Sequence, residues 1–60
     1  MDTHPLIYRV RIRVGTVELD FNHKSGDEAE AQYRKYDGLD ASVKLFQVNG
    51  QVTLVKENGR

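Results

Sequence analysis

Apolar and charged side chains alternate along the first part of the chain. From Leu6 to Val14 the pattern has a period of two residues, which is typical of a strand with one buried and one exposed face. The apolar positions are Tyr8, Val10, Ile12 and Val14, and the positions between them are Arg9, Arg11 and Arg13. The alternation resumes over residues 17–21, so a second strand is predicted there.

Residues 15–16 join these strands in a predicted two-residue hairpin turn. A type II′ turn requires a positive φ at its first position, where a glycine stands. This turn sets the apolar residues of both strands on one face, and a slip of one residue would separate them. It also places Arg13 opposite Glu18 and Arg11 opposite Asp20, and each such cross-strand pair is worth about 0.2 to 1 kcal/mol.

A helix is predicted to begin after Ser25 and to end at Gly38. Ser25 followed by Glu28 is a capping-box pattern, and the acidic start and basic end of the segment suit the helix dipole. Gly38 is expected to adopt a left-handed C-cap, with Leu39 folding back onto Tyr33. The apolar stripe expected to face the sheet consists of Ala29, Tyr33 and Tyr36.

A second hairpin is predicted around the Asn-Gly pair at residues 49–50, with strands over residues 41–48 and 51–56. This pair favours a two-residue type I′ turn, which needs a positive φ at both positions. The resulting register pairs Leu45 with Leu54. It directs Val43, Leu45, Val52 and Leu54 toward the helix, and Phe46, Val48 and Val55 toward the opposite face. A three-residue loop would move several of these side chains, and Phe46 and Val48 would then join the core; the sequence leaves both loops open.

The order of elements predicts an α+β fold of the type β-β-α-β-β. We expect a four-stranded antiparallel sheet in the order 2-1-3-4, with the helix packed on one face. Residues 1–60 would form a single small domain, with frayed ends over residues 1–5 and 57–60. Because one helix covers one face, the other face is open. Its expected side chains are Ile7, Arg9, Arg11, Arg13, Lys44, Phe46, Val48 and Val55.

Composition narrows the classes of function. Nine Lys and Arg balance nine Asp and Glu, so no long-range field attracts a polyanion. The chain has no cysteine, which excludes disulfides and thiolate zinc sites and makes self-association the expected support for a small core. No secretory signal pattern and no apolar run of about 20 residues occur, so we expect a cytoplasmic protein that does not enter membranes.

Candidate catalytic and metal-binding groups are few. Ser25 is expected to cap the helix, and Ser42 lies in no nucleophile motif. His4 and His23 are interpreted as solvated residues without neighbouring ligands. The acidic residues are better explained as partners of the arginines or of the helix dipole. We therefore expect no enzymatic activity, no cofactor and no metal.

The open face favours a protein interaction module, which would bind another protein or form a homodimer. Aromatic residues and arginines are enriched where proteins dock, and the arginines would bond to acidic groups on the partner. The edge strand over residues 51–56 offers a second route. The alternatives are nucleic-acid binding through the same face and a structural homodimer. The candidate partner-binding residues are Arg9, Arg11, Arg13, Lys44, Phe46, Val48 and Val55.

Overall fold

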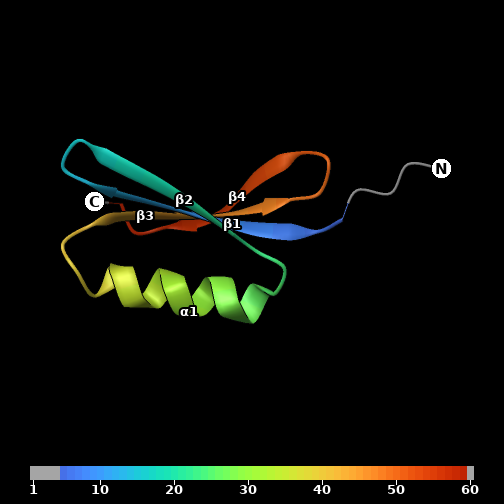
Figure 1. Cartoon of the computed structure of the whole chain (residues 1–60), viewed down its shortest axis with the longest axis horizontal. Coiled ribbons are helices and arrows are strands. Elements are labelled where there is room, and N and C mark those ends of the chain that lie inside the picture. Colours follow the sequence, from blue (N-terminus) through green and yellow to red (C-terminus); the bar gives the residue numbers. More distant parts are fainter. Residues whose placement is uncertain (1–4, 60) are drawn as a thin grey trace.

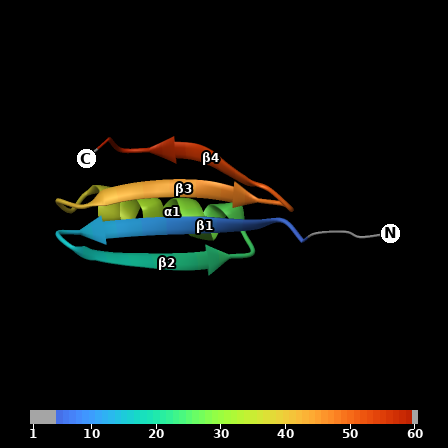
Figure 2. The same cartoon turned by 90° about the horizontal axis from the view of Figure 1, so that it is seen from above.

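The computed structural model, which describes residues 5–59, contains one antiparallel sheet with a helix against one of its faces (Figure 1). The elements are β1 (Ile7–Val14), β2 (Val17–His23), α1 (Gly26–Asp37), β3 (Ser42–Val48) and β4 (Val52–Glu57). The four strands lie in the order β2-β1-β3-β4, and α1 lies behind β1 and β3 (Figure 2). The predicted β-β-α-β-β fold is confirmed. Within residues 5–59, no helix is long and apolar enough to cross a membrane.

The first hairpin has the predicted register. Val14 pairs with Val17 and Arg11 pairs with Asp20, while Gly15 takes a φ of +61°. This left-handed conformation costs most L-residues about 1 to 2 kcal/mol, which explains the glycine at the first turn position. The second strand continues to His23, beyond its predicted end.

The helix begins where Ser25 and the acidic first turn predict. The Ser25 hydroxyl accepts a hydrogen bond from the amide of Asp27 at 3.2 Å, and Ser25 itself is extended. A cap of this kind satisfies one of the amides that have no partner inside the helix. Asp27 and Glu28 lie in the first turn, and Arg34 and Lys35 lie in the last, as the helix dipole favours.

The end of the helix differs from the prediction. Gly38 has a φ of −72°, so the left-handed cap is wrong, and its amide donates to the Arg34 carbonyl in a continued right-handed turn. Leu39 is 55% exposed and does not join the core beside Tyr33. The tight turn over residues 38–40 brings Ala41, which is 3% exposed, into the core instead.

The second hairpin turns through three residues, and the predicted two-residue register is wrong. Val48 pairs with Val52, which leaves residues 49–51 as the loop. Gly50 has a φ of +76°, whereas no non-glycine residue described has a positive φ, so a type I′ turn is excluded. A three-residue loop needs a left-handed conformation at only one position, which the glycine supplies.

A β-bulge in β4 follows this loop. Phe46 pairs with Leu54 but Leu45 pairs with Lys56, so Val55 has no partner across the ladder. The bulge brings Lys56 to the side of α1. Two residues predicted to lie beneath the helix, Val52 and Leu54, are instead on the opposite face and are 57% and 46% exposed.

The core lies between α1 and the two central strands. Ile12, Val10 and Val43 are its largest fully buried side chains, and Ala29 and Tyr33 meet them from α1. Ala41 and Leu45 complete the buried cluster, and Tyr8, Phe21 and Tyr36 pack at its margin. The predicted helix stripe and the inward faces of β1 and β3 therefore form this core.

Asn58 joins the end of the chain to three parts of the fold. Its side-chain Oδ1 accepts from the Val43 amide at 3.0 Å, and its Nδ2 donates to the Ala41 carbonyl at 2.8 Å and to Asp37 Oδ1 at 3.1 Å. The sequence assigned residues 57 and 58 to a frayed tail. Instead, Glu57 pairs with Lys44 of β3, and Asn58 contacts both β3 and the end of α1. Of the other residues expected to fray, 1–4 and 60 lie outside the described residues.

Lys56 connects the edge strand β4 to the helix. Its Nζ bonds to the Glu30 carboxylate and lies 4.5 Å from the centre of the Tyr33 ring. Arg34 also bonds to Glu30, with its Nε at 3.2 Å. The hydrogen bond from Lys56 is the main cause that lowers the pKa of Glu30, whereas burial raises the pKa of Tyr33.

Candidate interaction surface

The face of the sheet away from α1 carries the residues that alternate with the core positions. We call this surface the open face. Strands β2 and β1 contribute Glu18, Asp20, Asn22, Ile7, Arg9, Arg11 and Arg13. Strands β3 and β4 contribute Ser42, Lys44, Phe46, Val48, Val52, Leu54 and Glu57.

The open face changes in character along the strands. Near the loop of the second hairpin it is apolar. We call the residues Ile7, Phe46, Val48, Val52 and Leu54 the apolar corner, because the ladder places Ile7 beside Val48, Val48 beside Val52, and Phe46 beside Leu54. Toward the turn at Gly15 the face becomes charged, with Arg11 paired to Lys44 and Arg13 paired to Ser42.

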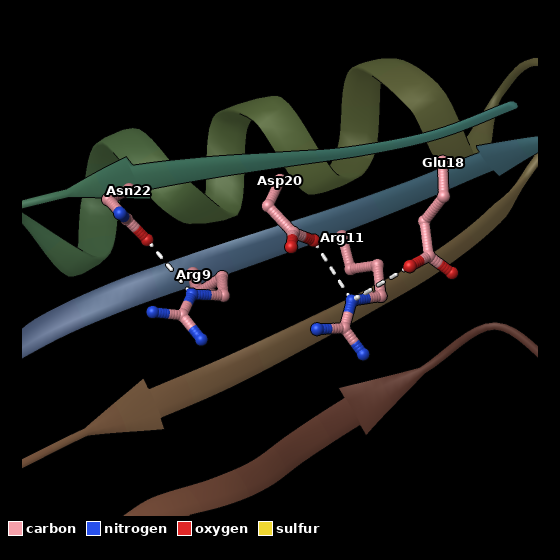
Figure 3. A network of polar contacts seen from close by, with 5 residues as sticks. All are labelled: Arg9, Arg11, Glu18, Asp20 and Asn22. Carbon is pink, nitrogen blue, oxygen red and sulfur yellow. Dashed lines mark hydrogen bonds and ion pairs between the residues drawn. The ribbon is translucent and has the colours of Figure 1, made fainter.

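Arg11 is ion-paired at the centre of this face. Its Nε donates to Asp20 Oδ1 at 2.9 Å and lies 3.7 Å from Glu18 Oε1 (Figure 3). Its Cζ lies 5.3 Å from the centre of the Phe46 ring. Phe46 lies on the neighbouring strand β3, diagonally from Arg11, because its direct partner in the ladder is Arg9. The hydrogen bond to Asp20 is the largest of the causes that raise the pKa of Arg11. Arg11 therefore contacts the Phe46 ring as well as two carboxylates on the open face.

Arg9 and Arg13 bond to neutral groups. The Nε of Arg9 donates to Asn22 Oδ1 at 3.1 Å, and the Nε of Arg13 donates to the Gly15 carbonyl at 3.4 Å. Glu18 pairs with Arg13 in the ladder as predicted, but among the described residues its ion pair is with Arg11. Both guanidinium groups thus keep an unneutralised charge at the surface.

Lys44 is a third cation of this kind. It lies across the ladder from Glu57, yet it forms no ion pair within residues 5–59. Together with Arg13 and Ser42 it lines a hollow of about 80 Å³, whose remaining walls are Arg11 and Glu18. Arg13 and Ser42 also border an open depression of about 390 Å³ beside Asp40.

The other candidate residues lie away from this surface. His23, at the end of β2, bonds through Nε2 to the Gln32 side chain, and its Nδ1 lies 3.9 Å from Glu28 Oε2. It connects the first hairpin to α1. His4 lies outside the described residues. In the described part of the chain, no group of three or more His, Asp or Glu side chains is arranged to hold a metal ion.

The structure brings together most of the predicted partner-binding residues. Arg9, Arg11, Arg13, Lys44, Phe46 and Val48 share the open face, whereas Val55 is the unpaired residue of the bulge.

Sequence reasoning missed Val52 and Leu54, because their face depends on the loop length. It also passed over Asn22, although the series Glu18, Asp20, Asn22 along one side of β2 breaks its charge pattern at that residue.

Comparisons of this chain with protein-family models, with curated proteins and with solved structures found no match.

Proposed function

We propose that this chain is a non-enzymatic protein interaction module that binds its partner through the open face. The observation that supports it most is the apolar corner. Val52 and Leu54 are 57% and 46% exposed and adjoin the half-buried Phe46 and Val48. Contiguous apolar surface rimmed by polar groups is typical of a protein-binding site.

The chemistry of the corner suits a docking surface. Valine and phenylalanine side chains have few rotatable bonds, so little conformational entropy is lost when they are immobilised in an interface. Arg11 fixes the Phe46 ring from one side, which pre-orders the largest side chain of the corner. Full burial of one such side chain is worth about 1.5 to 3 kcal/mol, so a few of them give a specific contact.

A matched pair of variants tests the proposal. Leu54→Ser alters the apolar corner, whereas Val17→Ser alters a valine that is 56% exposed on the helix side of β2. Tagged wild-type and variant proteins are used to capture partners from a host lysate, and bound proteins are identified by mass spectrometry. Circular dichroism and urea unfolding check that both variants fold.

We expect a partner that wild type and Val17→Ser retain and that Leu54→Ser loses. Equal capture by all three proteins would contradict the proposal. The alternative partner for the corner is a second copy of this chain. Sedimentation at several concentrations would then show a dimer for wild type and a monomer for Leu54→Ser, because the same side chains would form the interface.

A further inference from the structure

We infer that the partner of the open face is an acidic protein segment, in which apolar side chains are followed by carboxylates. This inference rests on the proposed function and adds the chemistry of the partner. It follows from the cations beside the apolar corner, which are not neutralised within the fold. These are Arg9, Arg13 and Lys44, the first two bonded to neutral oxygens and the third in no ion pair within the described residues.

Arg9 stands next to the apolar corner. It pairs with Phe46 on one side and with Asn22 on the other. Its terminal nitrogens point away from Asn22, over the sheet toward β3 (Figure 3). A carboxylate beside a side chain seated on Phe46 would therefore meet a guanidinium with free donors, and charge-assisted hydrogen bonds of this kind are about twice as strong as neutral ones.

Asn22 makes the charge at Arg9 available. The three arginines of β1 lie opposite Glu18, Asp20 and Asn22 of β2. If the arginines served only to hold β1 to β2 by charge, an acidic residue would be expected at position 22 as well. The amide accepts one hydrogen bond from Arg9 but carries no charge. Arg11, whose two carboxylate neighbours stabilise its charge, shows what the completed pair would look like.

The hollow at the charged end offers a second place for a carboxylate. Arg11, Arg13 and Lys44 supply three positive charges, Glu18 supplies one carboxylate and Ser42 supplies a hydroxyl around about 80 Å³ of space, so positive charge is in excess there. Rows of side chains along a strand lie about 7 Å apart on one face, so the residues of this hollow lie one to two rows from Phe46. An extended segment seated on the apolar corner reaches it with its next few residues.

A protein segment suits this surface better than a nucleic acid. Glu18, Asp20 and Glu57 flank the cations on both sides, so the positive charge is confined to short stretches that suit a few carboxylates better than a continuous phosphate backbone. The Phe46 ring has Arg11 over it, so that face is not free to stack on a base. The remaining side chains of the apolar corner are aliphatic, which favours apolar side chains of a protein.

The inference is tested with labelled synthetic probes and fluorescence anisotropy. The first peptide reads Val-Phe-Val-Glu-Asp-Glu, the second has lysine in place of each acid, and the third has serine in place of each apolar residue. A single-stranded RNA oligonucleotide is the fourth probe. The protein is used as wild type, Asn22→Asp, Asn22→Gln and Leu54→Ser.

We expect wild type to bind the first peptide at least about tenfold more tightly than the second, with affinity that falls as salt screens the charges. Asn22→Asp should weaken binding by about fivefold because the new carboxylate neutralises Arg9, while its urea midpoint stays equal or rises. Asn22→Gln, which keeps the amide, should bind nearly as wild type does.

Three results would overturn the inference. Equal affinity of the acidic and lysine peptides, or of Asn22→Asp and wild type, would show that the cations do not select the partner. Tighter binding of RNA than of any peptide would assign the face to nucleic acid. If the captured partner depends on Leu54 but not on salt or Asn22→Asp, the proposed function stands and the acidic partner is wrong.

Discussion

Several polar side chains connect elements of the fold in addition to the contacts of the small core. Asn58 links the end of the chain to β3, to the loop before it and to the end of α1. Lys56 links β4 to α1 through Glu30 and Tyr33, and Arg11 links β1 to β2 and to Phe46. In a chain whose core supplies at most about 3 to 5 kcal/mol, each of these contacts is a large part of the stability.

Replacing Asn58 tests the most connected of these side chains. Asn58→Ala removes the acceptor of the Val43 amide and a donor to Ala41, and leaving such groups without partners costs about 1 to 3 kcal/mol. Urea unfolding followed by circular dichroism measures the loss. Asn49→Ala, in the exposed loop of the second hairpin, is the control and should change stability little. Equal midpoints for the two variants would contradict the role given to Asn58.

Glu30 predicts a pH dependence of stability. Its pKa in the folded protein is lowered from the ordinary 4.5, mainly by the hydrogen bond from Lys56. The contribution of the pair is therefore complete above pH 4.5 and is lost as the pH falls through the lowered value. Urea midpoints between neutral and acidic pH should fall less steeply for Glu30→Gln than for wild type. Identical slopes would show that the pair contributes nothing.

At the scale of elements, the two hairpins differ in how far sequence determines them. In the first, the glycine turn, the apolar alternation and the charge pairs all favour one register, and that register is observed. In the second, Asn-Gly is compatible with a two-residue and a three-residue loop. The bulge at Val55 then reverses which of the following side chains of β4 face the helix. The loop error moved Val52 and Leu54 to the wrong face, yet Val43 and Leu45 remained in the core.

The positions of Lys44 and Lys56 in the sequence indicate the bulge. With the three-residue loop and no bulge, Lys44 would face Lys56, two like charges across the ladder. The bulge at Val55 replaces this pair with Lys44 and Glu57 and turns Lys56 toward Glu30. These charges indicate the bulge only once the loop length is known, and the Asn-Gly pair leaves that length open.

Gly50 in the hairpin loop and Gly38 at the end of the helix differ in backbone conformation, so replacing them with alanine should have different effects on stability. Gly50 has a φ of +76°, so Gly50→Ala should cost about 1 to 2 kcal/mol. Gly38 has a φ of −72°, and a Cβ there would lie 3.7 Å from its nearest neighbours, so Gly38→Ala should be neutral or stabilise by about 0.4 to 1 kcal/mol. Thermal unfolding compares them. A left-handed cap at Gly38 in solution would make both variants unstable.

The bulge makes an unusual deletion tolerable. Since Val55 is the extra residue of β4, removing it leaves Leu54 opposite Phe46 and Lys56 opposite Leu45 in a regular ladder. We expect the deletion variant to fold, as shown by its amide NMR spectrum. Deleting Lys44 is the control, because one of its core neighbours Val43 and Leu45 would then leave the core. An unfolded Val55 deletion would contradict the assigned register.

For the whole molecule, the helix covers the central strands and leaves one face of the sheet to solvent (Figure 2). The sequence predicted this half-covered arrangement and the cations and Phe46 on its open side. It could not predict the extent of the apolar corner, since Val52 and Leu54 reach that face only through the three-residue loop. It also could not show that Arg11 is ion-paired while Arg9 bonds to a neutral amide, because that depends on side-chain geometry.

The same arrangement predicts how protection from hydrogen exchange is distributed. Strands β1 and β3 have neighbours on both sides and carry the most buried residues, so their amides should open only with global unfolding. Amides of β2 and β4 at the sheet edges should exchange faster. Exchange measured by NMR for Val10 and Ile12, compared with Leu19 and Leu54, checks this. Uniform protection across all strands would contradict it.

The bulge also limits growth of the sheet beyond the single molecule. A regular, unpaired strand can template added chains and lead to fibres. Here β4 is regular only over Val52–Leu54 before the bulge bends it, and the outer strand β2 carries Glu18 and Asp20, which repel a like strand. The molecule can therefore expose an apolar surface on its face while its edges resist polymerisation, so concentrated solutions should stay clear.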